Sequence, residues 1–253
     1  MVEFVVVVES RADAEIATVL AERLLIEKVD WLEQELLQYV FQWSGLQENT
    51  PYSCWTDINK IIKNAKESGM RLPKFIGHSK QKNIKADGAS SIKILNFIRI
   101  LQKNRPIKAV FLIRDLDNQP ERREGMKQAR SEHTERLPQL EIIIGTANRM
   151  REAWVLNGFI PLDEEEGKTL ENIKSQLNFD PCIESHRLRS NSFEEPNRIR
   201  NPKVVLETLT RNDRLREQKC WEETSLELLQ QRGNQTGLTA YLQEVELHIV
   251  PLI

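Results

Sequence analysis

The 253-residue sequence lacks the features that mark secreted and membrane-spanning proteins. Its three cysteines, Cys54, Cys182 and Cys220, lie far apart and form no CxxC pair, which favours free thiols in a reducing compartment. No stretch approaches the roughly 18 apolar residues that cross a bilayer. The apolar run at the N-terminus carries Glu3, where a signal peptide has Lys or Arg. These absences predict a cytoplasmic protein without a membrane span.

A strong net charge and an ATP-binding loop are also missing. The chain has 36 Lys and Arg against 38 Asp and Glu, so any surface that binds nucleic acid must be a local one. It contains no GxxxxGK[ST] phosphate loop, and we do not expect it to hydrolyse ATP by itself. Its 40% hydrophobic and 29% charged residues are typical of an ordered globular protein.

Segments with strand character alternate with helical segments over the first 160 residues. The β-branched run Val2 to Val8 indicates a buried strand, and Ser10 is placed to cap the helix that follows. Helical periodicity continues to residue 40, and turn-forming residues predict a loop at 44–56. Further strands are expected at 73–78, 107–113 and 140–144, and further helices at 58–69, 89–102, 121–136 and 150–156. This order predicts an α/β domain, residues 1–160, with a largely parallel sheet flanked by helices.

The pattern changes after residue 160. No convincing strand occurs before the last few residues, and helical periodicity is found at 170–177, 204–209, 225–231 and 238–245. We therefore expect residues 161–253 to form a mainly helical C-terminal extension that packs on the first domain.

Carboxylates follow two of the predicted strands. Glu9 comes directly after the first strand, and Asp115 and Asp117 end the segment VFLIRDLD. The carboxyl ends of parallel strands face a common crevice, so these three side chains converge if the two strands are neighbours. Repulsion among them is relieved most simply by a divalent cation such as Mg²⁺, which prefers oxygen ligands and often binds substrate phosphates. The structural alternative is that the acids cap helices or form turns.

At these residues the sequence resembles the Toprim domain, the catalytic core of type IA and II topoisomerases, primases and nucleases of the overcoming-lysogenization-defect type. The resemblance covers roughly residues 2–156 and rests on VVVVE ending at Glu9, FIGH with Gly77, and FLIRDLD with Asp115 and Asp117. It implies that the two aspartates bind Mg²⁺ or Mn²⁺ and that Glu9 transfers a proton or binds metal. The tyrosine domains of topoisomerases and the zinc modules of primases have no counterpart here, so a nuclease is the expected activity.

A further carboxylate is implied by a subgroup of Toprim-like proteins that are encoded beside ATPases. Its members have a glutamate before an aromatic residue at the start of the helix after the fourth strand, and ANRMREAWVLNGF, with Glu152 and Trp154, is similar. The resemblance implies that Glu152 is an additional metal ligand and that an ATPase protein is a partner in defence or repair. The alternative for Glu152 is a solvated helix residue beside a core tryptophan.

Nucleic acid is the expected substrate, and a basic segment could bind its backbone. Residues 71–93 carry six lysines and arginines against a single acid, Asp87. Cations beside a metal site can neutralise phosphates without reading base sequence. The lysines that we expect to do so are Lys74, Lys80, Lys82 and Lys85. A solvated loop is the simpler explanation of this segment.

Two other functions remain open. FLIRDLDNQ also resembles the strand and DxD motif of haloacid-dehalogenase-like phosphatases, in which Asp115 would be the nucleophile and Thr146 would orient the phosphate. In that family the motif normally ends the first strand, whereas more than 100 residues precede it here. The second alternative is a Toprim-like fold that serves only as a binding module for a partner.

Overall fold

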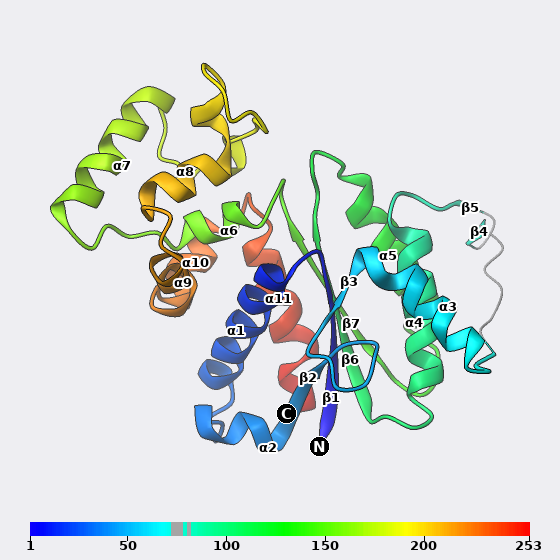
Figure 1. Cartoon of the computed structure of the whole chain (residues 1–253). Coiled ribbons are helices and arrows are strands. Elements are labelled where there is room, and N and C mark those ends of the chain that lie inside the picture. Colours follow the sequence, from blue (N-terminus) through cyan, green and yellow to red (C-terminus); the bar gives the residue numbers. More distant parts are fainter. Residues whose placement is uncertain (72–77, 80–81) are drawn as a thin grey trace. The chain divides into compact units, whose positions relative to one another are not determined.

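The computed structural model describes residues 1–71, 78–79 and 82–253 (Figure 1). The Cα positions divide into two compact units. Unit 1 consists of residues 1–145 together with 243–253, and unit 2 of residues 146–242. In the described ranges, no helix combines the length and the hydrophobicity that a membrane span requires.

Unit 1 is built on a parallel five-stranded sheet, which confirms the predicted α/β class. Its central strand β1 (Val2–Val8) runs parallel to β6 (Ile107–Asp115) on one side and to β2 (Phe41–Ser44) and β3 (Ser53–Cys54) on the other. Strand β7 (Glu141–Ala147) lies beyond β6. The continuous apolar runs of β1 and β6 are buried on both faces, as expected for inner parallel strands.

Strands β2 and β3 lie one after the other along the same side of β1. β2 pairs with Val2 to Val5 and β3 with Val7 and Val8, so residues 45–52 leave the sheet between them. Gly45 permits the turn, because a Cβ atom there would lie 2.3 Å from Oγ1 of Thr50. The helical segment predicted up to residue 40 is divided: α1 ends at Lys28, and a 3₁₀ turn (Gln34–Leu36) and α2 (Leu37–Val40) follow. β2 was not predicted, because four residues are too few to show a strand period.

The helices of unit 1 cover both faces of this sheet. Helix α1 lies on one face and α3, α4 and α5 on the other (Figure 1). Ser10 caps α1 as predicted, because its Oγ accepts a hydrogen bond from the backbone N–H of Asp13 at 3.4 Å. The bounds are α1 Arg11–Lys28, α2 Leu37–Val40, α3 Ile58–Glu67, α4 Gly88–Leu101 and α5 Glu121–His133, with short 3₁₀ turns at Gln34–Leu36 and Trp55–Asp57. A two-residue pair, β4 (His78–Ser79) and β5 (Lys82–Asn83), precedes α4.

Apolar side chains fill both sides of the sheet. On the α1 side, Phe4 stacks on Phe41 with ring centroids 4.7 Å apart, and Trp43 meets Phe111 edge to face at 5.0 Å. The indole N–H of Trp43 donates to Oε1 of Glu22 in α1 at 2.6 Å. On the other side, buried residues from α3, α4 and α5 pack against Val5 and Val7 in a single cluster.

The last residues of the chain return to unit 1 and are held there by polar contacts. Glu244 accepts a hydrogen bond from Nη1 of Arg130 at 2.5 Å, and Nδ1 of His248 lies 2.8 Å from Oε2 of Glu141. Glu244 and His248 belong to α11 (Leu238–His248), which begins in unit 2. A 3₁₀ turn, Val250–Leu252, follows.

The described part of unit 2 is helical, in agreement with the predicted C-terminal helices. Its helices are α6 Glu152–Asn157, α7 Glu164–Leu177, α8 Pro202–Leu209, α9 Arg214–Glu222 and α10 Leu226–Arg232, with 3₁₀ turns at Ser185–Arg187 and Arg198–Arg200. Helix α9 was not predicted, because charged residues dominate its sequence. It supplies Arg216, whose Nε donates to Oε1 of buried Glu166 at 2.7 Å. The packing of the helical extension on the sheet stays a prediction.

Helix α5 ends at a histidine that makes the stability of unit 1 sensitive to pH. His133 is fully buried, and in the described part of the chain neither ring nitrogen has a hydrogen-bond partner. Burial, together with the positive charges of Arg136 and Arg99, lowers its pKa from 6.5 to about 4. The unfolded chain therefore binds this proton more readily than the folded protein does in the range between these two pKa values.

We expect the free energy of unfolding to be highest above about pH 6.5 and to fall by up to roughly 3 kcal/mol as the pH drops toward 4. Denaturant unfolding at a series of pH values measures this dependence. In His133→Leu, the free energy of unfolding should depend less on pH, because the contribution of this histidine is lost. The contributions of the carboxylates should remain. An identical pH dependence in wild type and variant would contradict the assignment.

Candidate functional site at the carboxyl ends of β1 and β6

The predicted acids after β1 and β6 are brought together by the sheet. β1 and β6 are parallel neighbours, with Val7 opposite Leu112, so both strands end at the same edge. Glu9 directly follows β1, and Asp115 is the last residue of β6. Oε1 of Glu9 accepts a hydrogen bond from the backbone N–H of Asp115 at 3.2 Å. The two strand ends are thus joined by the residues that the sequence singled out.

Asp117 follows on a tight turn that a buried leucine holds in place. Leu116 is 5% exposed, and its carbonyl oxygen accepts from the N–H of Gln119 at 2.6 Å. Asp117 and Asn118 have positive φ angles of 45° and 63°, a conformation that Asp and Asn adopt more readily than most residues. The sequence LDN therefore forms the turn and also places a carboxylate just after the strand. The side chain of Asp117 is 45% exposed there.

Two arginines lie among these acids. Nη1 of Arg114 is 2.9 Å from Oε1 of Glu9, and its Nε is 2.9 Å from Oδ2 of Asp87. Nη1 of Arg122 is 2.9 Å from Oδ2 of Asp117 and donates to the carbonyl oxygen of Asp115 at 2.7 Å. Arg122 also lies 3.8 Å from Glu9 and 3.6 Å from Asp87. We call Glu9, Asp87, Asp115, Asp117, Arg114 and Arg122 the acid–arginine cluster.

Trp55 fixes the position of Arg114. Its indole N–H donates to the carbonyl oxygen of Ile113 at 2.7 Å, and the guanidinium carbon of Arg114 lies 5.4 Å from the centre of its ring. Trp55 follows β3 directly and is 9% exposed. β3 therefore contributes to the cluster indirectly, through a tryptophan that holds the end of β6 and the side chain of Arg114.

The surroundings of Glu9 shift the pKa of its side chain. Burial raises the pKa of Glu9 above its usual value of 4.5, which Arg114 and the N–H of Asp115 partly oppose. The negative charges of Asp117 and Asp13 raise it further. A carboxyl group with a raised pKa exchanges protons more readily near neutral pH than an ordinary glutamate does. Asp13, which the sequence indicated only as a helix-start acid, is 6% exposed and accepts from the Ser10 hydroxyl at 2.7 Å.

The carboxylates of the cluster are chemically suited to bind a divalent cation. Their present positions are not, and binding would require a rearrangement. Carboxylate oxygens are the ligands that Mg²⁺ prefers. Over the described ranges, however, no three His, Cys, Asp or Glu side chains are grouped so that they could hold a metal ion. The Asp117 carboxylate is paired with Arg122 instead. A cation between Asp115 and Asp117 therefore requires that Arg122 move away from Asp117.

Glu152 lies in unit 2. It begins α6 and is 8% exposed, so it is not the solvated helix residue of the alternative reading. Its Oε1 is 3.4 Å from Nη2 of Arg151, and Nη1 of Arg151 is 2.6 Å from Glu217. Its proposed role as a metal ligand stays a prediction. Trp154 is a core residue, 1% exposed and stacked on Tyr241.

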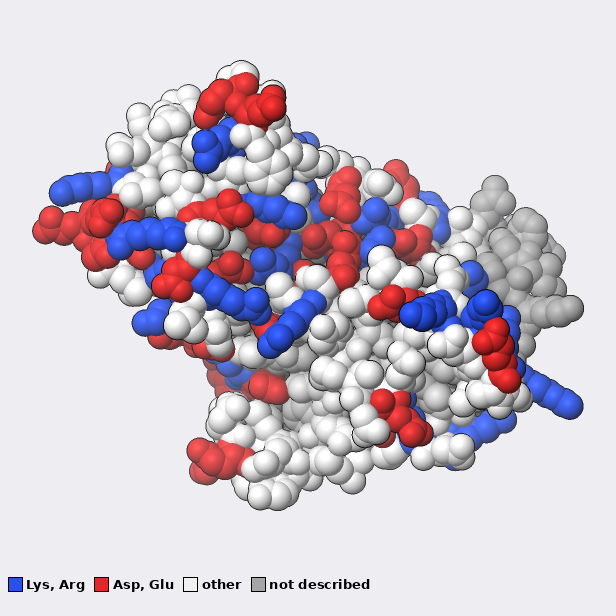
Figure 2. Space-filling model, viewed as in Figure 1, with Lys and Arg blue, Asp and Glu red and all other residues white. Residues whose placement is uncertain are grey.

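The structure describes only part of the predicted basic segment. Lys74 and Lys80 lie outside the described residues, as do Gly77 and all but the last residue of the strand expected at 73–78. Lys82 is placed by its backbone in β5. Lys85 is exposed, and its backbone N–H donates to Gln128 in α5 at 3.0 Å. Acidic and basic side chains are interspersed on the face drawn in Figure 2, so charge there does not by itself mark a surface for nucleic acid.

The sequence did not indicate Arg114, Arg122, Asp87 or Trp55 as parts of a site. The sequence signal was weak, because the contacts of these residues join distant positions of the chain; Glu9 and Arg122, for example, are 113 positions apart. Comparison with protein-family models, curated proteins and solved structures finds no match to this chain.

Proposed function

We propose that unit 1 hydrolyses phosphodiester bonds of DNA or RNA with Mg²⁺ or Mn²⁺ as cofactor. The observation that carries the proposal is the hydrogen bond between Glu9 and the backbone of Asp115, because it brings the ends of β1 and β6 together at one edge of the sheet. Asp117 and the two arginines lie at the same edge, where Arg114 pairs with Glu9 and Arg122 with Asp117. Ligands of parallel α/β sheets bind at this edge. A phosphate site of this kind needs two kinds of group. Carboxylates bind the metal ion, and guanidinium groups donate hydrogen bonds to the phosphate oxygens.

Each side chain has a distinct role in this proposal. Asp115 and Asp117 would hold the cation, and Glu9, with its raised pKa, would take a proton from the attacking water or return one to the leaving oxygen. A bound Mg²⁺ polarises a phosphate and stabilises the leaving oxygen. Arg114, fixed by Trp55 and Asp87, would orient the phosphate.

Arg122 links the two halves of the site. In this structure its guanidinium group lies closest to the carboxylate of Asp117 and the carbonyl of Asp115. If Asp117 held a cation, its carboxylate would release Arg122, and the guanidinium group of Arg122 would then be available to a phosphate. Metal and substrate should therefore bind more tightly together than separately.

Incubation of the pure protein with supercoiled DNA, single-stranded DNA and RNA tests the proposal. We expect cleavage of at least one substrate with Mn²⁺ or Mg²⁺ and none with EDTA. A small phosphate ester, p-nitrophenyl phosphate, should remain intact, because hydrolysis of that compound alone would indicate the phosphatase alternative. Absence of cleavage of every nucleic acid with both metals, together with no heat of Mn²⁺ binding in calorimetry, would refute the proposal.

A binding module without catalytic activity is the second candidate, and the ion pairs of the cluster favour it. Arg114 and Arg122 together contact three of its carboxylates, Glu9, Asp87 and Asp117, so part of the negative charge is neutralised without any metal. A partner of this kind would be a protein, for instance the ATPase implied by the resemblance to the Toprim-like subgroup. Lack of metal binding combined with recovery of a tight ATPase complex from cells would support this candidate.

A further inference from the structure

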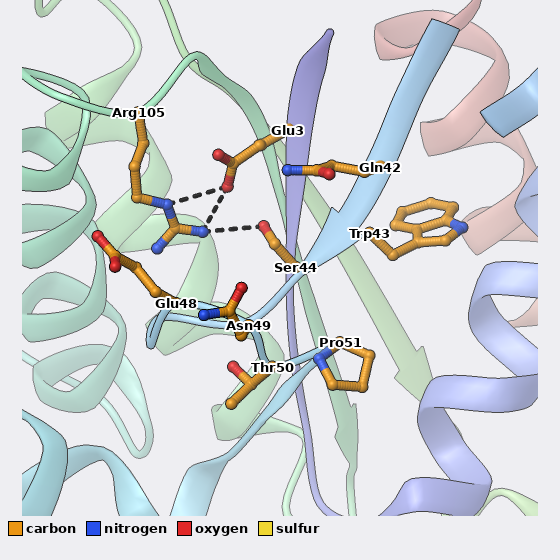
Figure 3. A pocket seen from close by; sticks show the side chains of 9 residues that line it. All are labelled: Glu3, Gln42, Trp43, Ser44, Glu48, Asn49, Thr50, Pro51 and Arg105. Atoms are coloured by element: carbon orange, nitrogen blue, oxygen red, sulfur yellow. Dashed lines mark hydrogen bonds and ion pairs between the residues drawn. The ribbon is translucent and has the colours of Figure 1, made fainter. Parts of the chain in front are cut away.

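A polar cavity lies near the amino-terminal ends of β1 and β6, away from the acid–arginine cluster. It has a volume of about 450 Å³ and is bordered by Glu3 of β1, by β2, by Arg105 just before β6, and by the loop 45–52 (Figure 3). Glu3 and Glu9 are six residues apart along an extended chain, which corresponds to roughly 20 Å. The cavity is therefore separate from the acid–arginine cluster. Its volume lies within the roughly 300 to 1,000 Å³ that small-molecule sites occupy.

Arg105 holds the cavity together and has little binding capacity left. Its Nε and Nη2 both donate to Oε2 of Glu3, at 2.9 and 2.5 Å. Nη2 also donates to the Ser44 hydroxyl at 3.1 Å and to the Gly45 carbonyl at 3.0 Å, and Nη1 to the Leu46 carbonyl at 3.1 Å. The guanidinium group thus fastens the start of the loop to β1. It does not present its charge to an incoming anion.

The groups that remain available in the cavity are mainly acceptors. The second carboxylate oxygen of Glu3 makes no hydrogen bond or ion pair within the described parts of the chain, although the Glu3 side chain is only 9% exposed. Glu48, which is exposed, likewise has no partner among the described residues. Figure 3 shows both carboxylates beside Arg105, with the amide side chains of Gln42 and Asn49 nearby. Asn49 is held in the left-handed region with φ of 59°, which fixes the loop that carries it.

We propose that this cavity binds a small organic cation with N–H donors, such as an amine or a guanidinium compound. Glu3 and Glu48 carry two negative charges against the single positive charge of Arg105, so a cation completes the charge balance and an anion would be repelled. Charge-assisted hydrogen bonds from N–H groups to these carboxylates would fix the ligand, and the amides of Gln42 and Asn49 would accept or donate around it. Pro51 provides an apolar border for a short carbon chain.

Calorimetric titration with agmatine, which carries a guanidinium group and an amine, tests the proposal. We expect saturable binding with a Kd below roughly 1 mM. Choline, a cation without N–H donors, and succinate, an anion, should bind at least tenfold more weakly. Glu48→Gln should weaken agmatine binding about tenfold, because one charge-assisted bond is replaced by a neutral one.

Two further variants make the result specific. Glu33→Gln removes the same charge from an exposed residue that does not line the cavity, and it should leave the Kd of agmatine unchanged. Glu3→Gln keeps an acceptor for Arg105 and should also weaken binding, with its thermal unfolding measured to confirm that the protein is folded. The proposal is overturned if agmatine shows no saturable binding, if choline and succinate bind equally well, or if Glu48→Gln and Glu3→Gln both bind agmatine as wild type does.

Discussion

Asp115→Ala and Asp117→Ala should each lower metal-dependent cleavage of nucleic acid by at least about 1,000-fold, which corresponds to roughly 4 kcal/mol of lost transition-state stabilisation. The loss is expected because the two carboxylates would hold the cation that the reaction requires. The rate of cleavage at saturating Mn²⁺ measures the effect, and calorimetry with Mn²⁺ should show weaker binding in the same variants.

The fold should survive these changes. Asp115 is the last residue of β6, and Asp117 follows the strand with its side chain 45% exposed. Circular dichroism and thermal unfolding should therefore resemble those of wild type. Asp30→Ala, at an exposed residue of the same unit, is the matched control and should cleave normally. Undiminished cleavage by both Asp115→Ala and Asp117→Ala would exclude the proposed metal role.

Arg105→Ala should destabilise unit 1 by roughly 3–5 kcal/mol. The Arg105 and Glu3 side chains are each only 9% exposed, so removal of the guanidinium group leaves a buried carboxylate without its counter-charge. The carbonyl oxygens of Gly45 and Leu46 and the Ser44 hydroxyl lose a donor in the same step. Denaturant unfolding, followed by the fluorescence of the tryptophans, measures the change in free energy.

Lys103→Ala is the control for this prediction, because Lys103 is exposed two residues earlier. It should change the free energy of unfolding by less than about 0.5 kcal/mol. A double variant, Glu3→Gln with Arg105→Ala, should be less destabilised than Arg105→Ala alone, since it removes the buried charge as well. An Arg105→Ala protein as stable as the Lys103→Ala protein would show that solvent reaches Glu3 and replaces the arginine.

The elements that the sequence predicted well are those whose pattern is carried by neighbouring residues. The runs Val2–Val8 and Ile107–Asp115 are apolar over most of their length, and Ser10 has the acid that accompanies a cap. The adjacency of Glu9 and Asp115 could be predicted too, because parallel strands end at the same edge. β2 was missed, since four residues with one exposed side chain give neither a strand period nor a long apolar run.

The arginines of the cluster could not be predicted by the same means. Arg114 interrupts an apolar strand, and a strand pattern alone does not reveal that its partners are Glu9 and Asp87, in two other parts of the chain. Arg122 lies in a helix rich in charge, and the sequence pattern does not distinguish its side chain from those of the neighbouring charged residues. Its contacts depend on how α5 is placed after the turn at Asp117 and Asn118, which is a property of the tertiary structure.

The return of residues 243–253 to unit 1 has a consequence for biosynthesis. A ribosome makes the first 145 residues of this unit early, but Glu244 and His248, which bind Arg130 and Glu141, emerge only after the 97 residues of unit 2. At about 5–20 residues per second, this delay amounts to roughly 5–20 s. During that time the sheet of unit 1 lacks the part of α11 that belongs to it. Unit 2 can therefore fold before unit 1 is complete.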